Sequence, residues 1–188
     1  MEALLALDGN ILLFIQEHLR ADWLTPVMLV ITRLGGLGKI WIAVSLLLLC
    51  FKKTRWAGAA GLLGLIFSLA VNNVLLKNLV ARIRPYEVVE GLRLIAPRAT
   101  DFSFPSGHTG SSFAAAVAIC CMLKGSGMRW QYFLLVFAAL MGYTRLYVGI
   151  HYPTDVLAGL VTGVLCGYLA YRVITYVRGR MEAGGHTA

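Results

Sequence analysis

The stretch WAGAAGLLGLIFSLAVNNVLL, residues 56–76, decides the fold because it carries no charged side chain over 21 consecutive positions. A helix of that length rises about 1.5 Å per residue and spans the roughly 30 Å hydrocarbon core of a bilayer. The composition agrees, since 59% of the 188 residues are apolar and 14% are charged, against about 25% charged residues in soluble domains. These values exclude disorder, a coiled coil and a water-soluble globule, and they leave a single compact integral membrane domain.

Further apolar runs flank this stretch on both sides. Downstream they cover about residues 107–123, 130–148 and 154–175. Upstream, glycines near residue 36 separate residues 23–34 from residues 40–51, which leaves open one broken span or two short segments. We therefore expect an all-α fold, a polytopic transmembrane helical bundle of five to six spans.

The two ends of the chain differ from these runs. Residues 1–22 mix apolar and polar positions, with Leu12, Ile15 and Leu19 on one helical face, which is typical of an interfacial helix at the membrane surface. Residues 179–188 are expected to form a flexible tail. The single domain, residues 1–188, then has its motif-bearing core at about residues 56–175.

Charge and cysteine usage exclude two further classes. The net charge of +8 comes from 17 basic and 9 acidic residues, and in a membrane protein such an excess usually lies in cytoplasmic loops, so no nucleic-acid partner is expected. The four cysteines lie inside apolar stretches without a C-x-x-C pair. They are interpreted as small buried apolar residues and not as a metal site or a disulfide framework.

Polar side chains gather beside the apolar spans in three clusters, and their cost in a membrane marks them as functional candidates. KNLVARIRP (77–85) ends the uncharged span, FPSGH (104–108) precedes the next run, and TRLYVGIHYPTD (144–155) joins the last two runs. Because successive spans cross in alternate directions, all three clusters fall on one face of the membrane. They predict a pocket of cations, imidazoles and a carboxylate, which suits a phosphate ligand.

The residue types in these clusters explain that preference. Arginine offers a planar fork of donors to phosphate oxygens, and lysine adds a point charge. Residues 106–108 open a helix, so the first backbone N–H groups and the positive end of the helix dipole face an anion. A neutral imidazole can attack phosphorus. Asp155, four residues after His151, can hold one imidazole N–H and thereby select the tautomer.

The three clusters resemble the signature of the type 2 phosphatidic acid phosphatase superfamily, which includes vanadium haloperoxidases and glucose-6-phosphatase. That signature reads K-x6-RP, then PSGH, then SR-x5-H-x3-D, and residues 77–85 and 105–108 match its first two parts. The third part matches over residues 144–155, except that Thr144 stands in place of the usual serine and keeps the hydroxyl. The resemblance extends over about residues 56–175.

This resemblance implies a role for each matched residue. His151 would be the nucleophile that forms a phosphohistidine, Asp155 would activate it, and His108 would protonate the leaving oxygen. The residues expected to bind the phosphoryl group are Lys77, Arg84, Ser106, Gly107 and Arg145. The resemblance also implies that no metal and no other cofactor takes part.

The remaining basic residues receive other assignments. Arg82 matches no motif position and is interpreted as an anchor at the membrane edge. Arg93 and Arg98, in the long loop 86–104, are candidates for contacting a second phosphate. Eight uncommitted basic residues lie in the loops opposite the motifs and three on the motif side. We expect the chain in the cytoplasmic (inner) membrane if it is bacterial. The positive-inside rule then predicts that its active site faces the periplasm or the exterior.

The resemblance thus implies an integral membrane phosphatase that acts on a lipid phosphate or diphosphate. Its small size is similar to that of bacterial undecaprenyl-diphosphate phosphatases, which favours hydrolysis of undecaprenyl diphosphate to undecaprenyl phosphate and phosphate. Phosphatidylglycerophosphate, phosphatidate and lipid A are alternative substrates, because their phosphatases share the motifs. A non-catalytic lipid-binding or transport protein is the alternative from another class, although binding alone would not need His108, His151 and Asp155. Membrane lipids are expected partners, and the sequence leaves the oligomeric state open.

Overall fold

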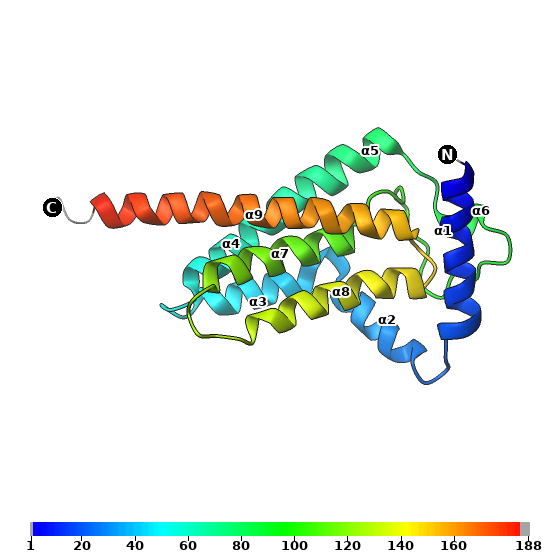
Figure 1. Cartoon of the computed structure of the whole chain (residues 1–188), viewed down its shortest axis with the longest axis horizontal. Helices are drawn as coiled ribbons and strands as arrows, with labels where there is room; N and C mark the ends of the chain where they lie inside the picture. Colours follow the sequence, from blue (N-terminus) through cyan, green and yellow to red (C-terminus); the bar gives the residue numbers. More distant parts are fainter. Residues whose placement is uncertain (1, 185–188) are drawn as a thin grey trace.

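A computed structural model describes residues 2–184, which contain helices and no strand (Figure 1). In chain order the elements are α1 (Glu2–Phe14), η1 (Ile15–Leu19), α2 (Thr25–Leu34), η2 (Gly36–Gly38), α3 (Lys39–Leu49), α4 (Arg55–Ser68), η3 (Leu69–Leu76), α5 (Lys77–Val80), α6 (Pro85–Val88), α7 (Gly107–Leu123), α8 (Gln131–Tyr147) and α9 (Pro153–Gly184). Elements η1 and η3 are π-helical, and η2 is a 3₁₀ turn. The all-α class expected from the sequence is confirmed for this part of the chain.

Helices α3, α4, α7, α8 and α9 run side by side as a bundle, and α1 lies across one end of it (Figure 1). Helix α7 occupies the centre, in contact with α4, α8 and α9. Its alanine-rich middle, residues 114–118, is almost wholly buried. In α1 and η1, Leu12 and Ile15 are buried against the bundle end, whereas Leu19 is exposed.

Small residues set the close approach of α9 to α7. Gly159, Gly163 and Gly167 recur every four residues along the face of α9 that meets α7. A Cβ atom on any of them would lie 2.5–2.6 Å from a carbonyl oxygen of Ser106, Gly110 or Ala114. Small residues at this spacing let helix backbones touch within a membrane, where van der Waals packing drives association.

The structure contains helices that can cross a membrane. Two stretches are long and apolar enough, Arg55–Val88 and Pro153–Ala183. The pair Thr25–Leu34 and Gly36–Leu49 qualifies as a third when taken together, although the two helices meet at 52°. The chain is thus an integral membrane protein, and these lengths account for two to three of the five to six expected spans.

Two expectations need correction. The sequence predicts a flexible tail from residue 179, but α9 remains helical to Gly184, and residues 185–188 lie outside the described part. The helix continues because no proline interrupts it and because Arg178 pairs with Glu182 one turn later, at 2.8 Å.

Cys50 is exposed, and not buried as its apolar neighbours suggest, whereas Cys120 and Cys166 are buried.

Candidate active site

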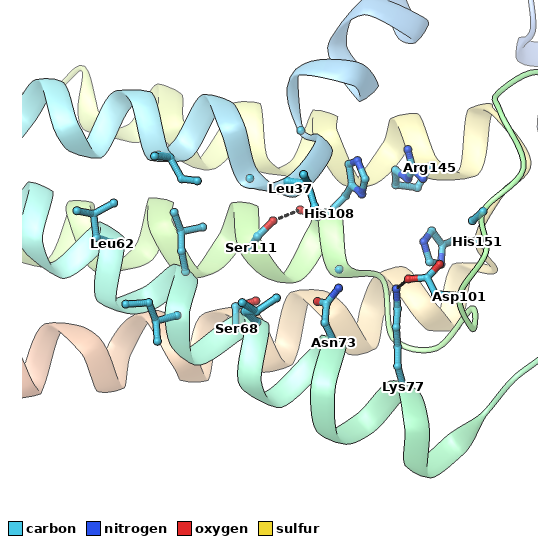
Figure 2. A pocket seen from close by; sticks show the side chains of 18 of the residues that line it. Leu37, Leu62, Ser68, Asn73, Lys77, Asp101, His108, Ser111, Arg145 and His151 are labelled. Atoms are coloured by element: carbon cyan, nitrogen blue, oxygen red, sulfur yellow. Dashed lines mark hydrogen bonds and ion pairs between the residues drawn. The ribbon is translucent and has the colours of Figure 1, made fainter.

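A cavity of about 590 Å³ is lined by residues from the bend between α2 and α3 through to Lys77 and His151 (Figure 2). Its polar part lies toward the end of the bundle that α1 crosses (Figure 1). We call this end of the bundle the cavity end. All three motif clusters reach the cavity. Its polar lining includes Asn73, Lys77, Arg84, Asp101, His108, Ser111, Arg145 and His151. The structure therefore brings the three clusters to one cavity, as the alternation of the spans predicts.

The other half of the cavity is apolar. It lies toward the middle of the bundle, beside the bend between α2 and α3 (Figure 2). Its lining side chains come from that bend, α3, α4 and the start of η3, and they are Leu37, Ile42, Leu62, Leu65, Ile66 and Leu69. One continuous space thus presents charged donors at one end and aliphatic side chains at the other.

Arg84 is the most extensively bonded cation of the site. It immediately precedes Pro85, the first residue of α6, and its guanidinium is buried. Its Nη2 donates to the carbonyl of Phe102 at 3.0 Å and to the carboxylate of Asp101 at 2.6 Å. Its Nη1 donates to His151 Nε2 at 3.1 Å. Because arginine has no acceptor, Nε2 must carry the lone pair of the imidazole and Nδ1 its hydrogen.

His151 stands in the turn between α8 and α9, with its Nδ1 3.4 Å from Asp155 Oδ2. This separation is longer than a normal N–H···O bond but joins the two groups in the expected sense. Burial lowers the pKa of His151 to about 3, the hydrogen bond to Asp155 opposes this shift, and the charge of Arg84 reinforces it. The imidazole is therefore neutral at neutral pH. Its Nε2 carries a lone pair at the lining of the cavity, which is what a nucleophile requires.

Asp155 lies behind His151 and is fully buried. Its Oδ2 accepts from the Ser103 hydroxyl and from the backbone N–H of Tyr152 at 3.0 Å, and its Oδ1 accepts from Arg82 Nη1 at 2.7 Å. Tyr152 is the residue before α9, so Asp155 closes the helix start as the acidic partner of a capping box does. Four donors, counting His151, thus fix this carboxylate.

His108 and Arg145 form the wall across the cavity from α5 (Figure 2). His108 is the second residue of α7, and a Cβ atom at Gly35 would come within 2.9 Å of its ring. Glycine in the bend after α2 therefore makes room for the imidazole. Arg145 Nη1 donates to the Thr32 hydroxyl at 2.5 Å, but its buried Nε has no hydrogen-bond partner within residues 2–184. An unpaired buried N–H beside the cavity is a donor available to an anion.

Asp101 is a site residue that the motifs do not indicate. It comes from the loop between α6 and α7, and its carboxylate binds both Lys77 Nζ and Arg84 Nη2. Burial raises the pKa of Asp101, but the hydrogen bond from Lys77 and the charges of Lys77 and Arg84 outweigh it and hold the pKa below its ordinary value. An ionised carboxylate thus forms ion pairs with two of the cations that are expected to bind phosphate. The available signal was that Asp101 is the sole acid between residue 91 and the PSGH motif.

Two residues of the PSGH motif, Ser106 and Gly107, differ in their position relative to the cavity. Ser106 is buried and outside the cavity lining, and its hydroxyl accepts from the backbone N–H of Thr109 at 3.4 Å. Its side chain caps α7 and does not face the expected phosphate. Gly107 does line the cavity, where a Cβ atom would lie 3.0 Å from the Asn73 side chain.

Three arginines outside the motif positions also depart from expectation. Arg82 is not a membrane-edge anchor, because its side chain is only 17% exposed and binds Asp155. Arg98 is 75% exposed and pairs with Glu87 at 3.2 Å. Arg93 and Arg98 both lie outside the cavity lining, since the loop that carries them is tied to η1 by a hydrogen bond between the Arg93 N–H and Gln16 at 2.7 Å.

Metal-binding groups are a separate question. Within residues 2–184, no three histidine, cysteine, aspartate or glutamate side chains are arranged to hold a metal ion. The charged lining consists of three cations and one carboxylate, Lys77, Arg84, Arg145 and Asp101. Such a set favours a polyanion over a metal.

Comparison with known proteins adds family information. The sequence profile of the PAP2 superfamily matches residues 58–178. Undecaprenyl-diphosphatase of Sulfolobus acidocaldarius is 33% identical over 135 residues, which cover 71% of this chain and 63% of that protein. Lipid A 4'-phosphatase of Bacteroides thetaiotaomicron is 31% identical over 157 residues, 77% of this chain and 68% of that protein. The match therefore spans less than two thirds of the Sulfolobus protein.

A solved structure extends the similarity over nearly the whole fold. The crystal structure of a transmembrane PAP2-type phosphatidylglycerolphosphate phosphatase from Bacillus subtilis superposes with a TM-score of 0.75 at 26% identity. The superposition covers 94% of this chain and 89% of the other. At this coverage the similarity extends beyond residues 58–178, the part that matches the sequence profile.

Proposed function

Because this chain belongs to the PAP2 superfamily, we propose that it hydrolyses a lipid phosphate or diphosphate through a phosphohistidine, without a metal ion. The division of the cavity carries this proposal: three cations and two imidazoles lie at one end, and six aliphatic side chains lie at the other. A phosphorylated headgroup fits the first half and the start of a hydrocarbon tail fits the second. A purely polar phosphate ester would leave the apolar half unused.

The geometry supports a two-step reaction. In the first step Nε2 of His151 attacks phosphorus, the bond from phosphorus to the lipid oxygen breaks, and His108 gives that oxygen a proton. In the second step water attacks the phosphohistidine, the phosphorus–nitrogen bond breaks, and His108 takes the proton of the water. Arg84 Nη1 now bonds Nε2, so it must turn from the imidazole to the phosphoryl oxygens before attack.

The cations contribute by charge stabilisation. Lys77, Arg84 and Arg145 line the same half of the cavity as His151, where they can neutralise the charge that grows on the phosphoryl oxygens. Asp155 holds the Nδ1 hydrogen and so keeps the lone pair on Nε2. Apart from the attacking water, the proposed chemistry thus uses only side chains of this chain.

Undecaprenyl diphosphate is the substrate we place first. The named function of the Sulfolobus relative supports it, whereas the expected second-phosphate contacts at Arg93 and Arg98 do not, because neither lines the cavity. Lipid A and phosphatidylglycerophosphate have their own support in the names of the Bacteroides and Bacillus proteins. Phosphatidate has support from the superfamily motifs alone.

We also place the cavity end outside the cytoplasm, with five crossings formed by the α2–α3 pair, α4 to α5, α7, α8 and α9. The opposite end carries exposed basic residues, which are Lys52, Lys53, Arg55, Lys124, Arg129, Arg172, Arg178 and Arg180. Short basic loops favour the cytoplasmic side. Single cysteines at exposed Arg98 and Lys124, in a cysteine-free background, test this in intact cells with a membrane-impermeant thiol reagent that has access to the outer surface. Labelling is expected at 98 and not at 124, and the reverse pattern would contradict this orientation.

The catalytic proposal is tested with the purified 188-residue chain in detergent. Phosphate release is measured from undecaprenyl diphosphate, phosphatidylglycerophosphate, phosphatidate and lipid A, with and without EDTA. We expect release that persists in EDTA, fastest with undecaprenyl diphosphate, and inhibition by vanadate as a mimic of the five-coordinate phosphoryl group. Binding of these lipids without any release would favour the non-catalytic alternative, and loss of activity in EDTA that Mg²⁺ restores would contradict the metal-free mechanism.

A further inference from the structure

A chain of buried charges connects α1 with the His151–Asp155 pair. The guanidinium of Arg82 lies between two carboxylates, with Nη2 2.8 Å from Asp8 Oδ2 and Nη1 2.7 Å from Asp155 Oδ1. Asp8 is 2% exposed and Asp155 is 0% exposed. The ring of Tyr152 covers the guanidinium, with its centroid 3.7 Å from Cζ. Arg82 is thus held on both edges and on one face.

Asp8 has a second set of contacts at the start of α9. Its Oδ1 accepts from the backbone N–H of Thr154 at 3.1 Å, and its Oδ2 accepts from the Thr154 hydroxyl. Thr154 belongs to the first turn of α9, where unpaired N–H groups and the helix dipole favour a carboxylate. Asp8 therefore fixes the turn that carries Asp155 both directly and through Arg82.

The charge of this cluster is suited to the reaction. Asp8, Arg82 and Asp155 together carry a net charge of −1 beside a neutral His151. When His151 attacks phosphorus, its imidazole acquires positive charge, and a fixed negative cluster stabilises that charge in the transition state. If Asp8 were neutral, Arg82 would cancel the charge of Asp155 and the imidazole would lose this stabilisation.

We propose that Asp8 and Arg82 are positioning residues for the His151–Asp155 pair, so that the N-terminal helix completes the site. Asp8 lies outside residues 58–178, the part that matches the superfamily profile. This role rests on the proposed phosphatase function. It differs from a purely structural role, in which Asp8 would only dock α1 on the bundle.

The test compares kcat with phosphate affinity in the 188-residue chain. Asp8→Asn keeps the shape of the side chain and removes its charge. We expect kcat to fall about 5–30-fold, while KM and the inhibition constant of inorganic phosphate change less than about twofold, because Lys77, Arg84 and Arg145 are untouched. Arg82→Gln should lower kcat further than Asp8→Asn, because Asp155 then loses the guanidinium that holds its Oδ1 in place, and this loss of orientation outweighs the more negative charge that is left near His151. Arg82→Lys keeps one charged contact, so its kcat should lie between those of the wild type and Arg82→Gln.

Two further variants separate positioning from docking. Asp22→Asn removes an exposed acid that follows η1 and should leave kcat unchanged. Leu12→Ala weakens the apolar packing of α1 against Leu92 and Tyr152 without altering any charge. At a matched loss of Tm, Asp8→Asn should lose several-fold more kcat than Leu12→Ala.

The outcomes are distinct. If Asp8→Asn and Arg82→Lys keep the wild-type kcat, or if they lose no more kcat than Leu12→Ala at equal Tm, the positioning role is wrong while the phosphatase function stands. If Asp8→Asn does not fold, Arg82→Lys decides by the same comparison. If the wild-type chain releases no phosphate from any lipid of the panel, the proposed function fails and this role fails with it.

Discussion

The two ends of the bundle use charge in different ways. At the cavity end, Arg84, Arg145 and Asp155 are buried, and each binds groups from other segments of the chain. At the opposite end, the loops after α3 and α7 and the last turns of α9 carry exposed basic residues, and the pair Arg178–Glu182 lies within one helix. Burying an ion costs free energy, so buried ions are usually paired with other groups and often belong to functional sites. Exposed charge of one sign is sufficient to orient a membrane protein.

The largest expected effect comes from removing the proposed nucleophile at the cavity end. His151→Ala should lower kcat for phosphate release by at least about 10³-fold, because no other neutral imidazole is held against Asp155. The protein should still fold and bind inorganic phosphate through its cations. Steady-state phosphate release and thermal unfolding measure the two parts, and near-normal kcat in this variant would exclude the phosphohistidine.

A smaller effect is expected when an arginine becomes lysine at each end. Arg84→Lys keeps the charge but loses the fork that bonds Asp101, Phe102 and His151, so kcat/KM should fall about 10²-fold. The matched control is Arg129→Lys, an exposed residue at the opposite end, which should leave kcat/KM within about twofold. Equal effects of the two substitutions would remove the distinction between the ends.

Asp101 allows a gain of binding to be tested. Its carboxylate pairs with Lys77 and Arg84 in the polar half of the cavity, where we propose that phosphate binds, so it should compete with an incoming phosphoryl group. Asp101→Asn should therefore strengthen inhibition by inorganic phosphate and vanadate about 3–10-fold. Weaker inhibition in this variant would indicate that Asp101 holds the two cations in place and does not compete with phosphate.

A further expected effect concerns stability and its dependence on pH, and not activity. The pKa of His151 is about 3 in the folded chain and about 6.5 when unfolded, so protonation favours the unfolded chain. The stability that neutral His151 contributes is full above pH 6.5 and is lost progressively as the pH falls toward 3. His151→Asn should therefore show a smaller decline of Tm between pH 6.5 and pH 4 than the wild type. An identical decline in both proteins would contradict the buried neutral state.

Much of the fold follows from local signals in the sequence. Helix α7 begins at Gly107 and ends at Leu123, the bounds of the predicted apolar run, because the Ser106 cap and the glycine-containing joint after Leu123 are both local. The bend between α2 and α3 likewise falls at glycines, with Leu37 and Gly38 in the left-handed region. Helix α9 extends beyond its apolar run, because the ion pair of Arg178 and Glu182 supports the helix where apolar residues are few.

The candidate site was predictable for residues that belong to sequence motifs. It was not predictable for residues outside the motifs, whose contacts appear only in the folded chain. Lys77, His108 and His151 stand at signature spacings and meet in one cavity. Asp8 and Arg82 are 74 positions apart, and no periodicity in the sequence links them. Likewise, the sequence identifies Ser106 as part of a helix start, but only the tertiary structure shows that its hydroxyl bonds Thr109 and lies outside the cavity lining.

The central claim is that His151 forms a covalent bond to phosphorus, and oxygen exchange between inorganic phosphate and water tests it most directly. In H₂¹⁸O, attack of His151 on phosphate expels one oxygen as water, and hydrolysis of the phosphohistidine returns an ¹⁸O from the solvent. The wild-type chain should enrich phosphate in ¹⁸O, as followed by mass spectrometry, whereas His151→Ala should not. Equal enrichment by His151→Ala, or lipid phosphate hydrolysis by the wild type without any exchange, would contradict the claim.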